Sequence, residues 1–135
     1  MENNFHVEYL KKVNFQKRLE KLSKKLKNKS IVIYGTGMFF EDLKNSYDLS
    51  ALNIIAVSDR KFTHHEQDEE FLGYKVCAPE EIAALNPDCV LVATINIVKI
   101  MESLENTVLK GTKIKLMPLV KKTFKDIWNE IWDLI

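Results

Sequence analysis

The sequence predicts an α/β fold in which a five-stranded parallel sheet lies between two layers of helices. Short apolar runs alternate with amphipathic segments along the 135 residues, which is the pattern of strands joined by crossover helices. The runs are rich in β-branched residues and lack polar alternation, as in parallel strands covered on both faces. Right-handed crossovers then predict the strand order 3-2-1-4-5. The first run leads directly into Gly35-Thr-Gly37, a tight turn from strand to helix.

Length and composition fit one compact unit with a helix added at each end. The expected parts are residues 1–28, 29–121 and 122–135. Apolar residues make up 46% of the chain, and the net charge of +1 gives no global field for nucleic acid. No apolar run reaches about 18 residues, so we expect no membrane span.

The N-terminus and the cysteines indicate the compartment. The first residues lack the basic and then apolar pattern of a signal peptide. Cys77 and Cys89 lie in or beside apolar runs, where we expect them to be buried free thiols in a reducing environment. We therefore expect a cytoplasmic protein.

The first thirty residues are predicted to form a basic amphipathic helix from about Val7 to Leu26. They hold nine lysines and arginines against three acids, and Leu19, Leu22 and Leu26 recur at helical spacing. The basic face allows contact with nucleic acid or a membrane surface, or it is simply solvated. The lack of interleaved aromatic residues favours a solvated face on a helix that docks on the domain or on a second subunit.

The strand over residues 30–34 and the turn after it form the centre of the predicted site. Gly35 lets the chain turn sharply, and Gly37 lets backbone N–H groups approach a pyrophosphate. The helix predicted from Met38 to Tyr47 points its positive end at that anion. The third fingerprint position holds Phe40 instead of glycine, so a tight turn that holds no ligand is the alternative.

The second strand, residues 53–58, is followed by Asp59. This carboxylate comes 24 residues after Gly35, close to the spacing of about 20 for an acid that binds a ribose. It would accept both ribose hydroxyls and repel a 2′-phosphate, which predicts NAD rather than NADP. Arg60 and Lys61 could instead turn toward a phosphate, and a simple loop aspartate is the alternative.

Residues 60–73 read as a polar loop over the ligand mouth. His64, His65, Glu66 and Asp68 suggest a metal site, but adjacent histidines point apart and no second histidine follows at i+4. We therefore expect no bound metal.

The second half of the chain continues the alternation of strands and helices. Thr94 and Asn96 follow an apolar strand and are expected at the carboxyl edge of the sheet, where ligands bind in such folds. The predicted strands are residues 74–77, 89–94 and 113–119, and the predicted helices begin at Pro79 and span 98–109 and 123–135.

Several motifs share one order with a known group of domains. The motifs are Gly35-Thr-Gly37, Ser58-Asp59, the short loop 60–73, Gly73-Tyr-Lys-Val76, Pro79-Glu-Glu81 and Pro87-Asp88. In this order, residues 29–120 resemble the Rossmann-like domains of nucleotide-sugar enzymes, namely the N-terminal domain of sugar O-acyltransferases and the NAD-binding portion of epimerase/dehydratase relatives. Phe40 and Arg60 depart from the pattern. The resemblance implies a Rossmann-like three-layer sandwich.

The function predicted from the turn, the acid and the resemblance is nucleotide binding, with NAD(H) or a nucleotide sugar as ligand. The resemblance implies a role in nucleotide-sugar or surface-polysaccharide metabolism. No catalytic constellation and no Tyr-x-x-x-Lys pair is present. The alternatives are a small NAD-dependent oxidoreductase with a pocket shared between subunits, and an interaction module with a vestigial site. The predicted binding residues are Gly35, Thr36, Gly37, Met38, Asp59, Arg60, Thr94 and Asn96.

The predicted assembly is a homodimer formed through the terminal helices. The C-terminal segment carries Trp128 and Trp132 close together. Two terminal helices with apolar faces can pack across a twofold axis, as in most small homo-oligomers.

Overall fold

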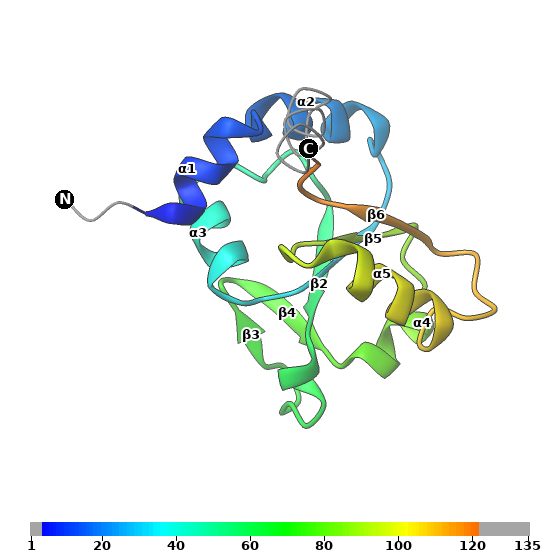
Figure 1. The fold of residues 1–135 in the computed structure, drawn as a ribbon. Helices are drawn as coiled ribbons and strands as arrows, with labels where there is room; N and C mark the ends of the chain where they lie inside the picture. The colour runs from blue at the N-terminus through cyan, green and yellow to red at the C-terminus, as the bar shows by residue number, and fades with distance from the viewer. Residues whose placement is uncertain (1–3, 122–135) are drawn as a thin grey trace, which may run out of the picture.

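The computed structural model describes residues 4–121 and shows a mixed α/β protein (Figure 1). Its six-stranded sheet has the order β3-β4-β2-β1-β5-β6, with β1 in the interior between β2 and β5. The strands are β1 (Ile31–Tyr34), β2 (Ile54–Ser58), β3 (Glu70–Phe71), β4 (Tyr74–Cys77), β5 (Cys89–Val92) and β6 (Lys115–Pro118). This confirms the α/β class.

The prediction of five strands, all parallel, is wrong at one edge of the sheet. β3 pairs antiparallel with β4, while the other four pairings are parallel. Leu72 and Gly73 connect β3 to β4, and both have positive φ angles, of 52° and 86°. Two such residues form the tight hairpin turn that joins antiparallel strands. The periodicity of the sequence gives no signal for this hairpin because β3 has only two residues.

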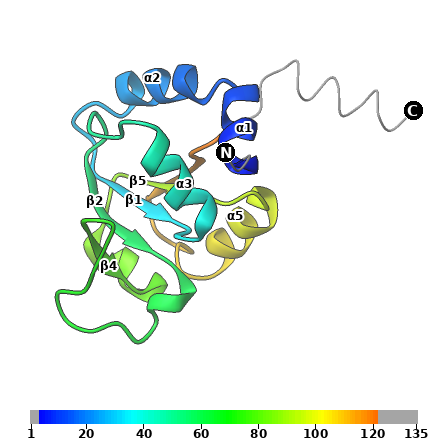
Figure 2. The ribbon, with the colours of Figure 1, turned by 90° about the vertical axis from the view of Figure 1, so that its left-hand side faces the viewer.

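Helices cover both faces of the sheet (Figure 2). Along β1, Ile31 and Ile33 belong to a core with α1, α2 and α3, while Val32 and Tyr34 belong to a second core with α4 and α5. Successive strand residues point to opposite faces, so one strand serves both cores. The helices are α1 (Phe5–Lys12), α2 (Phe15–Lys25), α3 (Met38–Ser46), α4 (Ile82–Leu85) and α5 (Ile97–Asn106), with 3₁₀ turns at Arg60–Phe62 and Pro79–Glu81.

The single N-terminal helix expected over residues 7–26 is instead two helices. α1 ends at Lys12, and α2 begins at Phe15 after Asn14, whose φ of 53° is left-handed. Asparagine tolerates this conformation better than most residues, and the N–H of Asn14 bonds the carbonyl of Lys11. The break lets α1 run beside α3, where His6 Nδ1 lies 2.6 Å from Asp42 Oδ2.

The leucines of the N-terminal segment lie in the core of the same domain. Leu19, Leu22 and Leu26 are buried against the face of the sheet that α2 covers. The Arg18 guanidinium donates to the carbonyls of Pro118 and Leu119, at 2.6 and 3.4 Å, and ties α2 to the end of β6. These leucines are therefore not available to the predicted dimer. Trp128 and Trp132, which the same prediction used, lie outside the described residues.

Phe40, the bulky residue at the third fingerprint position, is accommodated in the protein core. Its side chain is fully buried in the core under α3, and its ring lies 6.5 Å from that of Tyr74 on β4. A glycine at this position would let α3 pack closely against the sheet. Here the Phe40 ring fills the space between them instead.

Two further expectations concern the thiols and the membrane. Cys77 and Cys89 are free and buried, which confirms their expected state. Within residues 4–121, no helix is long and apolar enough to cross a bilayer.

Candidate functional site

The glycine turn, residues 35–37, lies at the carboxyl ends of three neighbouring strands, β2, β1 and β5. Gly35 has a φ of +105°, and a Cβ there would lie 2.7 Å from Thr94 Cγ2, just beyond β5. The N–H of Gly35 donates to the carbonyl of Ser58, the last residue of β2, at 2.9 Å. β1 has β2 on one side and β5 on the other, so the turn sits at the point where the strand order reverses. Ligands bind at that point in open α/β sheets.

Gly37 has a different environment from Gly35. It caps α3 with an extended φ of −77°, and a Cβ on Gly37 would meet no atom of residues 4–121 within 4 Å. Within the described part of the chain, no acceptor receives the N–H groups of Gly37, Met38 or Phe39. Met38 is 72% exposed. The start of α3 is therefore open, and it carries the partial positive charge of a helix N-terminus.

Asp59 is fastened to the glycine turn. Its Oδ2 accepts hydrogen bonds from the Thr36 N–H at 2.8 Å and from the Thr36 hydroxyl at 3.1 Å. Its Oδ1 accepts from the N–H of Lys61 at 3.3 Å. A carboxylate offers about four acceptor positions, so three of them are used within the protein. One position on Oδ1 remains for a ribose hydroxyl.

Lys61 completes this arrangement and was not among the predicted site residues. Its Nζ donates to the carbonyl of Thr36 at 2.8 Å and lies 4.3 Å from the centre of the Phe71 ring on β3. Such a cation–aromatic contact is favourable. Lys61 thus connects the glycine turn to the hairpin that the sequence did not predict, and its only sequence signal is its place two residues after Asp59.

An apolar hollow of about 210 Å³ opens at the carboxyl edge beside the turn. It is lined by Phe39 from α3, by Thr94 and Ile95 after β5, and by Pro118 at the end of β6. The Oγ1 atom of Thr94 is buried and has no hydrogen-bond partner among the described residues. A buried hydroxyl without a partner is costly, so this atom is suited to a polar ligand group.

A second, more polar hollow of about 220 Å³ is lined by Tyr34, Arg60, Glu80 and Ser103. Burial raises the pKa of the Tyr34 phenol, nearby Asp59 acts in the same direction, and the charge and hydrogen bond of Arg60 oppose them. The phenol is therefore neutral at pH 7. Its contact with Arg60 places that guanidinium on the polar hollow.

The predicted residues divide into a connected group and an outlying one. Gly35, Thr36, Asp59 and Thr94 are brought together by the contacts described above. Arg60 lies on the polar hollow. The outlying residue is Asn96, which is exposed and is the N-cap of α5, where its side chain makes no capping hydrogen bond.

His65, in the loop of residues 60–73 where the sequence suggested a metal site, contacts protein groups. The ring of His65 contacts the carboxylate of Glu81 and the carbonyl of Glu66. The Glu81 carboxylate also accepts the N–H of Ala78, at 2.8 Å, at the start of the second 3₁₀ turn. Among residues 4–121, no cluster of three or more potential metal ligands occurs.

Comparison with known proteins identifies a family for this chain. No curated protein and no solved structure matches the chain. The family model described as C2185-like, N-terminal, matches residues 27–115. This range begins just after α2, includes the glycine turn and Asp59, and ends at the first residue of β6. The match spans more than half of the sequence, and the chain therefore belongs to the C2185-like N-terminal domain family.

Proposed function

We propose that this protein is a nucleotide-binding module that holds phosphate at the start of α3. The observation that carries the proposal is the open space at Gly37, beside helix N–H groups that have no acceptor in the described chain. Backbone N–H groups at a helix N-terminus, reached over a residue without a Cβ, form a common phosphate site. The position of this turn, where the strand order reverses, supports the same proposal.

The ligand proposed is NAD(H) or a nucleotide sugar, as the resemblance to nucleotide-sugar enzymes implies. The apolar hollow beside Thr94 would receive the base or ring of such a ligand, with the unpartnered hydroxyl as a hydrogen-bonding group. The free acceptor position on Asp59 Oδ1 would accept one ribose hydroxyl. The resemblance further suggests a role in nucleotide-sugar or surface-polysaccharide metabolism.

One observation favours a second candidate, an interaction module with a vestigial site. The carboxylate of Asp59 accepts the N–H and the hydroxyl of Thr36, in the middle of the glycine turn. A negative group of the protein thus occupies donors that a phosphate could use. In this alternative the turn is satisfied internally and no nucleotide binds.

The two candidates are separated by a thermal-shift screen with NAD, NADP, UDP-sugars, CoA and S-adenosylmethionine. A ligand at 100 times its dissociation constant adds about 2.7 kcal/mol to the free energy of unfolding, which raises the melting temperature measurably. Stabilisation by NAD or a UDP-sugar supports the proposal, and the absence of any shift at millimolar ligand favours the interaction module.

Gly37→Val then tests the location of the site. Because a Cβ at Gly37 has free space, the variant should remain folded and lose the nucleotide-induced shift. Asn45→Val, on an exposed position of the same helix, is the matched control and should keep the shift. Unchanged binding by Gly37→Val would place the site elsewhere.

A further inference from the structure

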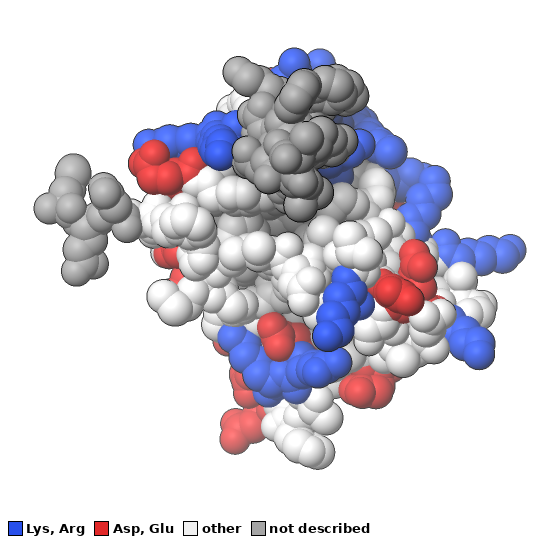
Figure 3. Space-filling model, viewed as in Figure 1, with Lys and Arg blue, Asp and Glu red and all other residues white. Residues whose placement is uncertain are grey.

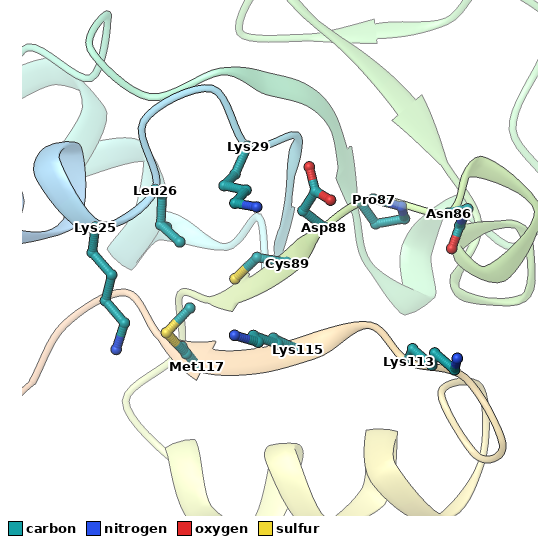
Figure 4. Close-up of a pocket in the computed structure, with 10 residues that line it drawn as sticks. All are labelled: Lys25, Leu26, Lys29, Asn86, Pro87, Asp88, Cys89, Lys113, Lys115 and Met117. Atoms are coloured by element: carbon teal, nitrogen blue, oxygen red, sulfur yellow. The ribbon is translucent and has the colours of Figure 1, made fainter.

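The amino edge of the sheet, opposite the glycine turn, contains a hollow of about 330 Å³ (Figure 4). Three stretches that are far apart in the sequence form it: the end of α2 with the connection to β1, the connection from α4 to β5, and the start of β6. The residues that line it include Lys25, Lys29, Asp88, Cys89, Lys113 and Lys115.

Of the residues that the structure describes, four lysines and one carboxylate line this hollow. Lys25 and Lys29 come from the α2 side, and Lys113 and Lys115 come from the β6 side. Residues two apart along a strand share a face, which explains why Lys115 and Met117 of β6 both reach the hollow, while Lys113 lies in the connection two residues before β6 begins. Figure 3 shows Lys and Arg side chains gathered along the side of the molecule where α2 and β6 lie.

The single carboxylate does not neutralise these lysines. Asp88 Oδ2 accepts hydrogen bonds from the N–H and hydroxyl of Ser30, at 2.8 and 3.2 Å. These bonds lower the pKa of Asp88, and the charge of Lys29 adds to that effect. Asp88 thus holds the start of β5 to the start of β1. In the described chain no carboxylate lies within ion-pair distance of any of the four ammonium groups.

Cys89 lines the hollow, and the positive charges around it act on its thiol. Burial raises the pKa of its thiol to about 11, while the charges of Lys115, Lys25 and Arg18 act in the opposite direction. The thiol is therefore protonated and unreactive at pH 7. It contributes packing, and the exposed lysines around it contribute the charge.

We propose that this lysine-lined hollow is a second binding site, distinct from the glycine turn, for a small polyphosphate anion. Lysine binds phosphate as a compact point charge, and four of them around one hollow match a group that carries several charges. Among residues 4–121, the lining includes neither an arginine fork nor an aromatic ring, so this part of the chain offers no platform for stacking a base. The site therefore recognises the phosphate chain and ignores a nucleoside attached to it.

The test is isothermal titration calorimetry of the full chain with inorganic tripolyphosphate at low salt. Removing one lysine–phosphate contact at the surface should weaken binding about fivefold. Lys29→Gln with Lys115→Gln, one lysine from each side of the hollow, should therefore lower the affinity about 25-fold. Lys99→Gln with Lys110→Gln changes the net charge equally at exposed positions outside the hollow and should keep the wild-type affinity. An equal loss in both double variants, or none in the first, would overturn the site.

Two further arms separate this site from the glycine turn. Gly37→Val should bind tripolyphosphate like the wild type, so this site and the proposed nucleotide site can fail independently. ATP should bind the hollow about as tightly as tripolyphosphate, because nothing there recognises the nucleoside. Binding of ATP alone, abolished by Gly37→Val, would assign the phosphate to the glycine turn and overturn the inference.

Discussion

The carboxylate of Asp59 receives both the backbone N–H and the hydroxyl of Thr36, at 2.8 and 3.1 Å. Thr36 is 1% exposed, so its two donors are shielded from water. The residue that the spacing assigned to a ribose therefore also holds the glycine turn in place. This double use links the stability of the turn to any ligand that it binds.

Asp59→Ala should lower the free energy of unfolding by about 1–3 kcal/mol, because it leaves buried donors of Thr36 without an acceptor. Thr36→Val removes only the hydroxyl and should cost less. Chemical denaturation of both single variants and the double variant measures the coupling between them, expected at about 0.5–3 kcal/mol for contacting residues. Additive effects would contradict the described contact.

Gly35→Ala should destabilise the protein by about 1–3 kcal/mol through its left-handed φ alone. The clash of the new Cβ with Thr94 adds to this cost. Gly37→Ala is the matched control, since its Cβ meets no atom, and it should change stability by less than about 0.5 kcal/mol. Thermal unfolding of the two variants without ligand distinguishes the structural glycine from the open one. Equal stability would contradict this assignment.

Phe40→Ala should cost about 3–5 kcal/mol, because it leaves a cavity under α3. Met38→Ala, two residues earlier and 72% exposed, serves as the control and should be nearly neutral. Denaturant midpoints with unchanged slopes provide the measurement. A small loss for Phe40→Ala would mean that α3 can collapse onto the sheet.

The contact between His65 and Glu81 predicts a dependence of stability on pH. The hydrogen bond to Glu81, followed by that to Glu66, raises the pKa of His65. The bond from Ala78, followed by that from His65, lowers the pKa of Glu81. Because folding raises its pKa, protonated His65 stabilises the fold fully below the unfolded value of about 6.5. This stabilisation is lost as pH rises through the folded pKa. Because folding lowers its pKa, ionised Glu81 stabilises the fold fully above the unfolded value of about 4.3. This stabilisation is lost as pH falls through the folded pKa.

The stabilising window of this pair therefore lies between about pH 4.3 and 6.5. Denaturation at several pH values measures this dependence. In His65→Ala the Ala78 N–H still holds Glu81, so part of the loss of stability below about pH 4.3 should remain. The loss of stability as pH rises above about 6.5 should disappear in that variant. His64→Ala, the exposed neighbour, should keep it. An unchanged profile in His65→Ala would show that the pair contributes nothing.

The predicted homodimer rests on Trp128 and Trp132, since the leucines of α2 are buried within the domain. Trp128→Glu with Trp132→Glu should give a folded monomer, because two charges would be buried in the interface. Met38→Glu, at an exposed position, is the control. Light scattering at micromolar concentration measures the mass, and a monomeric wild-type protein would contradict the prediction.

The sequence by itself determined the features that depend on neighbouring residues. The β-branched run of β1, the turn at Gly35 and the start of α3 follow from local sterics and propensity, and the structure has them where the pattern indicates. The burial of Cys77 and Cys89 follows from their place in apolar strands. The alternation of strands and helices likewise indicated the α/β class.

Only the tertiary structure decided the features that depend on contacts between distant segments. The strand β3 of the edge hairpin is only two residues long, and the break at Asn14 accompanies the packing of α1 beside α3 while α2 covers the sheet. The spacing of Asp59 suggested a ligand role, but its bonds to Thr36 arise only when β1 and β2 pair. The lysine-lined hollow joins residues from about 25 to 117, and no local pattern encodes such proximity.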